Sequence, residues 1–276
     1  SEALVDDKRP TYWFKYDHYK PNMERVEQVL SWLDQDESVP AFISLYFSIL
    51  DSAQHSFGVE SIQASEAATE VDNLVGELIS GLKQRQLYQD TAIVIVGDHG
   101  MTGLSSEQII YIDEVIGNDM WRKTSDPKHV YSPQLYSKLV GNQIFAYLYL
   151  GEQVNSERLV KDLRAHSEHW QVYDKSNMPN NAHLGHPTRQ PDIVLMPELG
   201  WLISQRHIPF SPTYVASHGY DPKAKEMHAT LIVKGNGVKP NSQCPSVENV
   251  NVHCIVATLL DAQPAEQNDC DQVLLN

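Results

Sequence analysis

Two short apolar runs constrain the fold of this chain more than any other feature. Residues 41–47 read AFISLYF and residues 91–96 read TAIVIV. Strands that are almost continuously apolar are typical of parallel sheets, in which both faces are buried. Apolar residues at helical spacing precede each run, over residues 22–33, where Asn22 is placed to cap the helix, and over 64–82. This alternation predicts an α/β fold with a mostly parallel central sheet and helices on both faces.

The rest of the sequence carries weaker patterns. The segment 48–59 is predicted as a loop. Helices are predicted over residues 156–165 and 250–260. Further strands are predicted over residues 145–150, 192–196, 201–204 and 230–233, with the middle two forming a hairpin. Residues 1–276 are interpreted as one large domain, in which the block of about 105–190 is a cap or an insertion on the α/β core.

The charge balance limits the class of partner. Asp and Glu number 36 against 21 Lys and Arg, which gives a formal net charge of −15. This balance opposes a surface that binds nucleic acid by neutralising its phosphates. Phosphate chemistry remains open, because bound metal ions can supply local positive charge. No segment approaches the roughly 18 uncharged apolar residues that a membrane span needs, so no span is predicted in this chain.

The three cysteines do not form a disulfide framework or a zinc-finger pattern. Cys244, Cys254 and Cys270 allow at most one bridge within the chain. Cys254 is interpreted as a small core residue on a helix face. Whether Cys244 or Cys270 forms a disulfide stays open, and the redox compartment stays open with it.

Three segments carry the residues suited to chemistry, and two of them start where a predicted strand ends. Asp51 and His55 follow the first apolar run, Asp98 and His99 follow the second, and His218 lies in a loop before the predicted strand 230–233. Ligands of open α/β sheets bind beyond the carboxyl ends of the strands. Carboxylate and imidazole together suit Zn²⁺ and related ions. Five such residues exceed the needs of one catalytic zinc and predict two metals about 4 Å apart, as used for phosphoryl transfer.

The other histidines do not share this placement. Eight of them, including His183 and His186 in a polar loop, are interpreted as surface or hydrogen-bonded residues.

The three segments resemble motifs of the nucleotide pyrophosphatase/phosphodiesterase family, the type I phosphodiesterases of the alkaline phosphatase superfamily. Asp51–His55 resembles the family's D-x-x-G-H-like segment, with Gln54 where members usually carry Gly. Asp98–Met101 matches D-H-G-M without change, and Ser217–Asp221 matches S-H-G-Y-D. Met227–Ala229 is also similar to the family. The resemblance runs over nearly the whole chain and implies an alkaline phosphatase-like fold.

The resemblance implies two zinc ions in each active site. Asp51, His55 and His218 would hold one zinc, and Asp98 and His99 would help to hold the other. The family's Thr or Ser nucleophile and a further Asp ligand are expected upstream of Ser1, so no catalytic nucleophile is assigned within this chain. On this interpretation residues 1–276 form the C-terminal portion of a catalytic phosphodiesterase domain, and the isolated chain is expected to lack diesterase activity.

The resemblance also implies where a nucleotide binds. Family members stack the nucleobase between aromatic side chains, which correspond here to Tyr16 and Tyr46. Core packing of Tyr46 on the strand, and loop packing of Tyr16, are the alternatives.

The implied activity is zinc-dependent hydrolysis of phosphodiester or pyrophosphate bonds in nucleotides through a covalent phospho-enzyme. The implied location is periplasmic or secreted, although the chain carries no signal peptide. One alternative is another phosphohydrolase of the superfamily, acting on phosphonates or on lysophospholipid or choline-phosphate diesters. A second alternative is a non-catalytic metal-binding module that retains the fold.

Overall fold

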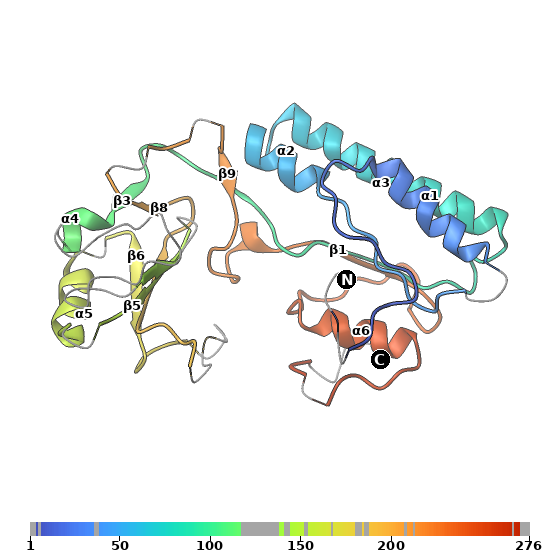
Figure 1. Cartoon of the computed structure of the whole chain (residues 1–276). Helices are drawn as coiled ribbons and strands as arrows, with labels where there is room; N and C mark the ends of the chain where they lie inside the picture. Colours follow the sequence, from blue (N-terminus) through green and yellow to red (C-terminus); the bar gives the residue numbers. More distant parts are fainter. Residues whose placement is uncertain are drawn as a thin grey trace. The chain divides into compact units, whose positions relative to one another are not determined.

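The computed structural model (Figure 1) divides into two units. Unit 1 comprises Ser1–Ser52, Ile62–Asp98 and Ala229–Asn276, and unit 2 comprises Ala53–Ser61 and His99–His228. The residues that the structure describes are Leu4, 7–35, 39–116, 138–140, 144–151, 154–166, 168–179, Leu184, 188–206, 209–211, 213–266 and 268–270.

Two helices of unit 1 pack along each other, α1 (Asn22–Leu33) and α3 (Ile62–Gln84) (Figure 1). Val26 and Val29 on α1 are buried, as are Ala67 and Leu74 on α3. The apolar spacing therefore predicted both helices correctly, although α3 is longer at each end than the predicted stripe.

The predicted cap of α1 is wrong. Pro21 occupies the N-cap position, and Asn22 is the first helical residue. The Asn22 side chain instead donates a hydrogen bond of 3.1 Å to the Glu70 carboxylate on α3. At the other end of the helix pair, the Arg85 guanidinium binds both carboxylate oxygens of Asp34, at 2.7 and 2.6 Å.

The strands of unit 1 pair differently from the expectation. β1 (Ile93–Val96) pairs antiparallel with β10 (Leu231–Lys234), and Val96 lies opposite Leu231. Segment 41–47 is not a strand, and Phe42 and Tyr46 are 58% and 51% exposed. A strand needs a hydrogen-bonded neighbour, and the described residues offer none to this segment. The predicted buried strand at 41–47 is therefore wrong for the described chain.

Unit 2 contains a four-stranded sheet in the order β4 (Lys138–Val140), β5 (Ala146–Tyr149), β7 (Ile193–Pro197) and β6 (Trp170–Asp174), with every pair antiparallel. Helix α5 (Ser156–Ala165) begins where the Asn155 side chain accepts a hydrogen bond from the Arg158 N–H. Its buried Leu159, Val160 and Leu163 belong to the same core as one face of the sheet.

The predicted hairpin of 192–196 with 201–204 is wrong. β7 pairs with β5 and β6, whereas β8 (Leu202–Ser204) pairs parallel with β3 (Ile109–Tyr111). This is the one parallel pair among the described strands. Helix α4 (Ile112–Ile116) follows β3 directly, and its Ile112 is fully buried in the core that α5 covers.

The third set of strands in unit 2 is short. β2 (Thr102–Gly103) pairs antiparallel with β9 (Ala216–Ser217), and Thr102 lies opposite Ser217. This pairing brings the segment after His99 beside the segment before His218.

 Helix α6 spans Asn251–Leu259, and its Cys254 is bonded to Cys270 with the two Cα atoms 6.2 Å apart. Cys254 is therefore not the unpaired core cysteine that the sequence predicted, because its partner arrives from a loop 16 positions away. Cys244 is free and exposed.

Candidate metal centre

Asp51 and His55 lie on a helix, α2 (Ile49–Phe57), and not in the predicted loop. Residues four apart face the same side of a helix, so α2 presents the carboxylate and the imidazole on one face. The helix ends at Phe57. The next residue, Gly58, has a φ of 96°, which glycine adopts without strain, and its N–H donates to the Gln54 carbonyl.

The His55 ring is held on two sides within unit 2. Its Nδ1 lies 2.7 Å from the Ala216 carbonyl oxygen, and the Tyr214 ring stacks on it with centroids 4.5 Å apart. A carbonyl oxygen only accepts hydrogen bonds, so Nδ1 carries the proton and Nε2 keeps its lone pair. Hydrogen bonding of one ring nitrogen in this way is typical of metal-binding histidines.

His99 and His218 meet face to face in the same unit. Their ring centroids are 3.4 Å apart and the ring planes differ by 8°. The His218 ring also lies 5.2 Å from the His55 ring. His99 Nδ1 is 2.9 Å from the Gly100 carbonyl oxygen, which again leaves Nε2 as the available ligand atom. Three imidazoles, drawn from segments far apart in sequence, therefore gather in unit 2.

Gly100 is required where the D-H-G-M segment turns. The Gly100 N–H donates to the Met227 carbonyl at 2.9 Å, and the Met101 N–H donates to the Glu226 carbonyl at 2.8 Å. A Cβ atom on Gly100 would lie 1.9 Å from the Glu226 oxygen and 2.7 Å from the His228 oxygen. Only glycine allows this close approach of two backbones, which fixes the chain next to His99.

Unit 1 carries the carboxylates and the two tyrosines. The Tyr16 and Tyr46 rings meet edge to face at 5.9 Å, and the Tyr16 hydroxyl donates to Ser48 Oγ at 3.3 Å. Partial burial raises the pKa of Tyr46, and the negative charges of Asp98, Tyr16 and Asp51 raise it further. Both rings are about half exposed, so neither is a core residue.

The donor chemistry of these residues fits a zinc ion. Within unit 2 the rings of His99 and His218 stack on each other, and imidazole is a common ligand of zinc. The family resemblance implies that His99 and Asp98 help to hold a second metal. The division of ligands between two metals stays a prediction. His183 and His186 lie outside the described residues.

Sequence reasoning missed the residues that orient the ligands. Tyr214 and the Ala216 carbonyl contact His55, although they lie about 160 positions away in the sequence. A contact between such distant residues cannot be predicted from the sequence around either of them. The sequence of the Met227–Ala229 segment is similar to the family, but similarity alone does not reveal its structural role. The backbone carbonyls of Glu226 and Met227 accept the hydrogen bonds that hold Gly100 and Met101 in place. The joint occurrence of the D-H-G-M motif and the Met227–Ala229 segment was the feature of the sequence that could have indicated this contact.

Comparison with curated proteins finds relatives along almost the whole chain. Venom phosphodiesterase 2 of Crotalus adamanteus is 28% identical over 271 residues, which cover 97% of this chain and 32% of the relative. Ectonucleotide pyrophosphatase/phosphodiesterase family member 3 of Rattus norvegicus is 28% identical, with 97% and 30% covered. Bis(5'-adenosyl)-triphosphatase enpp4 of Xenopus laevis is 25% identical, with 94% and 53% covered. The chain thus spans about a third of the length of the first two relatives.

Solved structures show the same fold. The murine ectonucleotide pyrophosphatase/phosphodiesterase 5 superposes with a TM-score of 0.80 at 23% identity, over 97% of this chain and 66% of that one. This likeness confirms the predicted alkaline phosphatase-like α/β fold. The model of the type I phosphodiesterase / nucleotide pyrophosphatase family matches residues 1–221. The chain therefore belongs to the type I phosphodiesterase / nucleotide pyrophosphatase family.

Proposed function

We propose that the full-length protein hydrolyses phosphodiester or pyrophosphate bonds in nucleotides, and that zinc bound by the aspartates and histidines of the candidate metal centre takes part. The observation that carries the proposal is the group of three imidazoles in unit 2. His99 and His218 stack at 3.4 Å, and His55 lies 5.2 Å from His218. Imidazole is a common ligand of zinc, so three imidazoles gathered from separate segments suit a zinc site.

The proposed ligands divide between two zinc ions. Asp51, His55 and His218 would hold the first, and Asp98 and His99 would help to hold the second. When bound, zinc supplies positive charge that polarises a phosphoryl group and favours the ionised form of an attacking hydroxyl. The chain's own contribution is orientation: the Ala216 and Gly100 carbonyls fix which nitrogen of His55 and of His99 faces the metal. We propose a covalent phospho-enzyme step, for which no nucleophile is assigned among these residues.

The proposed substrate is a nucleotide whose base stacks on Tyr16 and Tyr46. The two rings are exposed, and the Tyr16 hydroxyl donates a hydrogen bond to Ser48, which directly precedes α2. Stacking of a base on an aromatic side chain contributes about 1–3 kcal/mol. The Xenopus laevis relative is named as a bis(5'-adenosyl)-triphosphatase. We propose that dinucleoside polyphosphates are also among the substrates of the present protein.

The proposed location is periplasmic or secreted. The Cys254–Cys270 disulfide supports it, because disulfides persist in oxidising compartments outside the cytosol. Within the described residues, no helix has both the length and the apolar character needed to cross a membrane.

Metal content and activity test the proposal together. Zinc bound per chain is measured by mass spectrometry after dialysis, for the wild type and for His55→Ala, His218→Ala and His166→Ala. His166 is an exposed histidine at the end of α5 and serves as the matched control. The first two variants should lose zinc, and His166→Ala should retain it.

Hydrolysis by the full-length protein is then compared on a nucleotide p-nitrophenyl ester, on bis(p-nitrophenyl) phosphate and on a choline-phosphate diester. The proposal expects the nucleotide ester to be the best substrate. Preference for the choline-phosphate diester would assign the protein to a different branch of phosphohydrolases. Zinc binding without hydrolysis of any of the three would indicate a metal-binding module and would overturn the proposed activity.

A further inference from the structure

Arg25 on helix α1 makes a set of contacts that hydrogen bonding alone does not explain. Its Nη2 donates to the Asp17 carbonyl oxygen, and its guanidinium carbon lies 5.8 Å from the centre of the Tyr16 ring. Its Nε is buried and has no hydrogen-bond partner among the described residues. A buried N–H without a partner is unfavourable for folding, so stability alone does not account for an arginine at this position.

The carbonyl that Arg25 binds belongs to the turn directly after Tyr16. The Lys20 N–H donates to the same Asp17 carbonyl at 3.4 Å, and the Asp17 carboxylate accepts a hydrogen bond of 2.9 Å from the Tyr19 N–H. Arg25 lies in the first turn of α1, so its side chain ties this turn to the helix. The backbone that leads out of Tyr16 is thereby fixed.

The Tyr16 side chain is held at its hydroxyl and at its ring. The hydroxyl donates to Ser48 Oγ at 3.3 Å, and the Tyr46 ring meets the Tyr16 ring edge to face at 5.9 Å. The Arg25 guanidinium lies over the ring within the range of about 6 Å in which a cation is attracted to an aromatic face. Tyr16 is nevertheless 49% exposed, so area is left for a base.

We propose that Arg25 is a positioning residue for nucleotide recognition, which holds the Tyr16 ring in the orientation that receives the base. The inference rests on the proposed function and adds to it a residue that acts through Tyr16. A base binds more tightly to a ring whose orientation is fixed in advance, because less ring motion is lost on binding.

The specificity of the zinc-loaded, full-length protein tests the inference. The quantity measured is the ratio of kcat/KM for a nucleotide p-nitrophenyl ester to kcat/KM for bis(p-nitrophenyl) phosphate, which carries no base. Arg25→Met removes the charge and the hydrogen bond but keeps a long side chain. We expect it to lower the ratio about 2- to 30-fold, the range of one cation–π contact. The loss should appear as a raised KM for the nucleotide ester with kcat unchanged, because the base is remote from the bond that breaks.

A double-mutant cycle distinguishes positioning of Tyr16 from a general structural role. Tyr16→Ala alone should lower the ratio about 5- to 150-fold, as expected for one stacked base. Addition of Arg25→Met to Tyr16→Ala should lower the ratio no further, because Arg25 then has no ring to hold. Arg25→Lys keeps a cation on this side chain and should retain part of the ratio that Arg25→Met loses.

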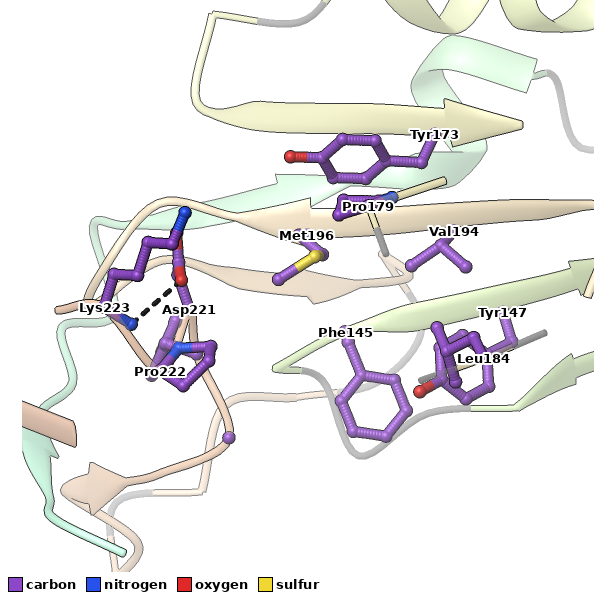
Figure 2. A pocket seen from close by; sticks show the side chains of 12 residues that line it. Phe145, Tyr147, Tyr173, Pro179, Leu184, Val194, Met196, Asp221, Pro222 and Lys223 are labelled. Atoms are coloured by element: carbon purple, nitrogen blue, oxygen red, sulfur yellow. Dashed lines mark hydrogen bonds between the residues drawn. The ribbon is translucent and has the colours of Figure 1, made fainter. Parts of the chain in front are cut away.

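Two control variants remove similar side chains elsewhere. Arg85→Met removes a guanidinium that binds Asp34, and it should lower the melting temperature without changing the ratio. Tyr173→Ala removes an aromatic side chain of β6 that lines a pocket in unit 2 together with Val194 and Met196 (Figure 2). This pocket is an alternative place for a base, so Tyr173→Ala should leave the ratio unchanged if the base stacks in unit 1.

An unchanged ratio in Arg25→Met, or a further fall when Arg25→Met is added to Tyr16→Ala, would overturn the positioning role while the proposed function stands. A ratio that falls in Tyr173→Ala but not in Tyr16→Ala would place the base in the pocket of unit 2 and would also overturn it. A full-length protein that hydrolyses neither substrate would overturn both the inference and the proposed function.

Discussion

Replacement of Gly100 with alanine should disturb both the stability of unit 2 and its metal binding. The added Cβ would lie 1.9 Å from the Glu226 carbonyl oxygen, and real contacts of this kind stay above 3.0 Å. The two backbones must therefore separate by about 1.1 Å. The obstacle is backbone on both sides, so no side-chain rotation can relieve it.

The cost can be worked out from the contacts that the separation breaks. The hydrogen bonds from Gly100 and Met101 to the 226–227 backbone are both strained or lost. Each contributes about 0.5–1.5 kcal/mol, so the free energy of unfolding should fall by about 1–3 kcal/mol. The Gly100 carbonyl also accepts the His99 Nδ1 proton. Loss of such an outer partner typically lowers metal affinity about 10- to 100-fold.

Thermal unfolding and zinc affinity, the latter by competition with a chromogenic chelator, measure the two effects. Gly103→Ala is the control, because a Cβ on Gly103 meets no atom within 4 Å and the residue lies three positions along the same segment. We expect Gly103→Ala to match the wild type and Gly100→Ala to unfold several degrees lower with weaker zinc binding. Wild-type values for both variants would refute the role assigned to this backbone contact.

Three further predictions concern separate features. In the full-length protein, Tyr46→Ala should weaken hydrolysis of a nucleotide diester much more than that of bis(p-nitrophenyl) phosphate, and equal losses would contradict a stacking role. The Arg85 guanidinium lowers the pKa of Asp34 below 3.8, so this pair stabilises the fold above that pH and its contribution is lost as the pH falls through the lowered pKa. The melting temperature of Asp34→Asn should therefore lie below that of the wild type at pH 7, and the difference should shrink as the pH falls below 3.8. Cys254→Ser, or reduction of the Cys254–Cys270 bridge, should lower the free energy of unfolding by about 3 kcal/mol, as expected for a loop of this length. The control Cys244→Ser, at the free and exposed cysteine, should leave the melting temperature unchanged.

Local patterns predicted the elements whose stability is decided locally. Helix α5 has an Asn155 cap and an apolar stripe within ten residues, and strand β5 falls inside the predicted range 145–150. Pairing could not be predicted in the same way. The segments 192–196 and 201–204 are close enough in sequence to suggest a hairpin, yet their partners come from other parts of the chain.

The same difference between local and distant contacts applies to the candidate site. The identities of Asp51, His55, Asp98, His99 and His218 were available from the motifs. Their supports were not, because the ring of Tyr214 reaches His55 only through tertiary structure. The disulfide escaped prediction because three cysteines allow more than one pairing, and sequence does not rank them.

The pairing of β1 with β10 has a consequence for how the chain is made. Val96 and its partner Leu231 are 135 positions apart, and nearly all of unit 2 lies between them. At a synthesis rate of roughly 5–20 residues per second, β1 waits for about 7–27 seconds before its partner leaves the ribosome. During that interval its hydrogen-bonding edge and the apolar Ile93, Val94 and Ile95 are open to other chains. Unit 2 can acquire its own core while unit 1 is still waiting, so slower translation should favour aggregation through β1 before it affects unit 2.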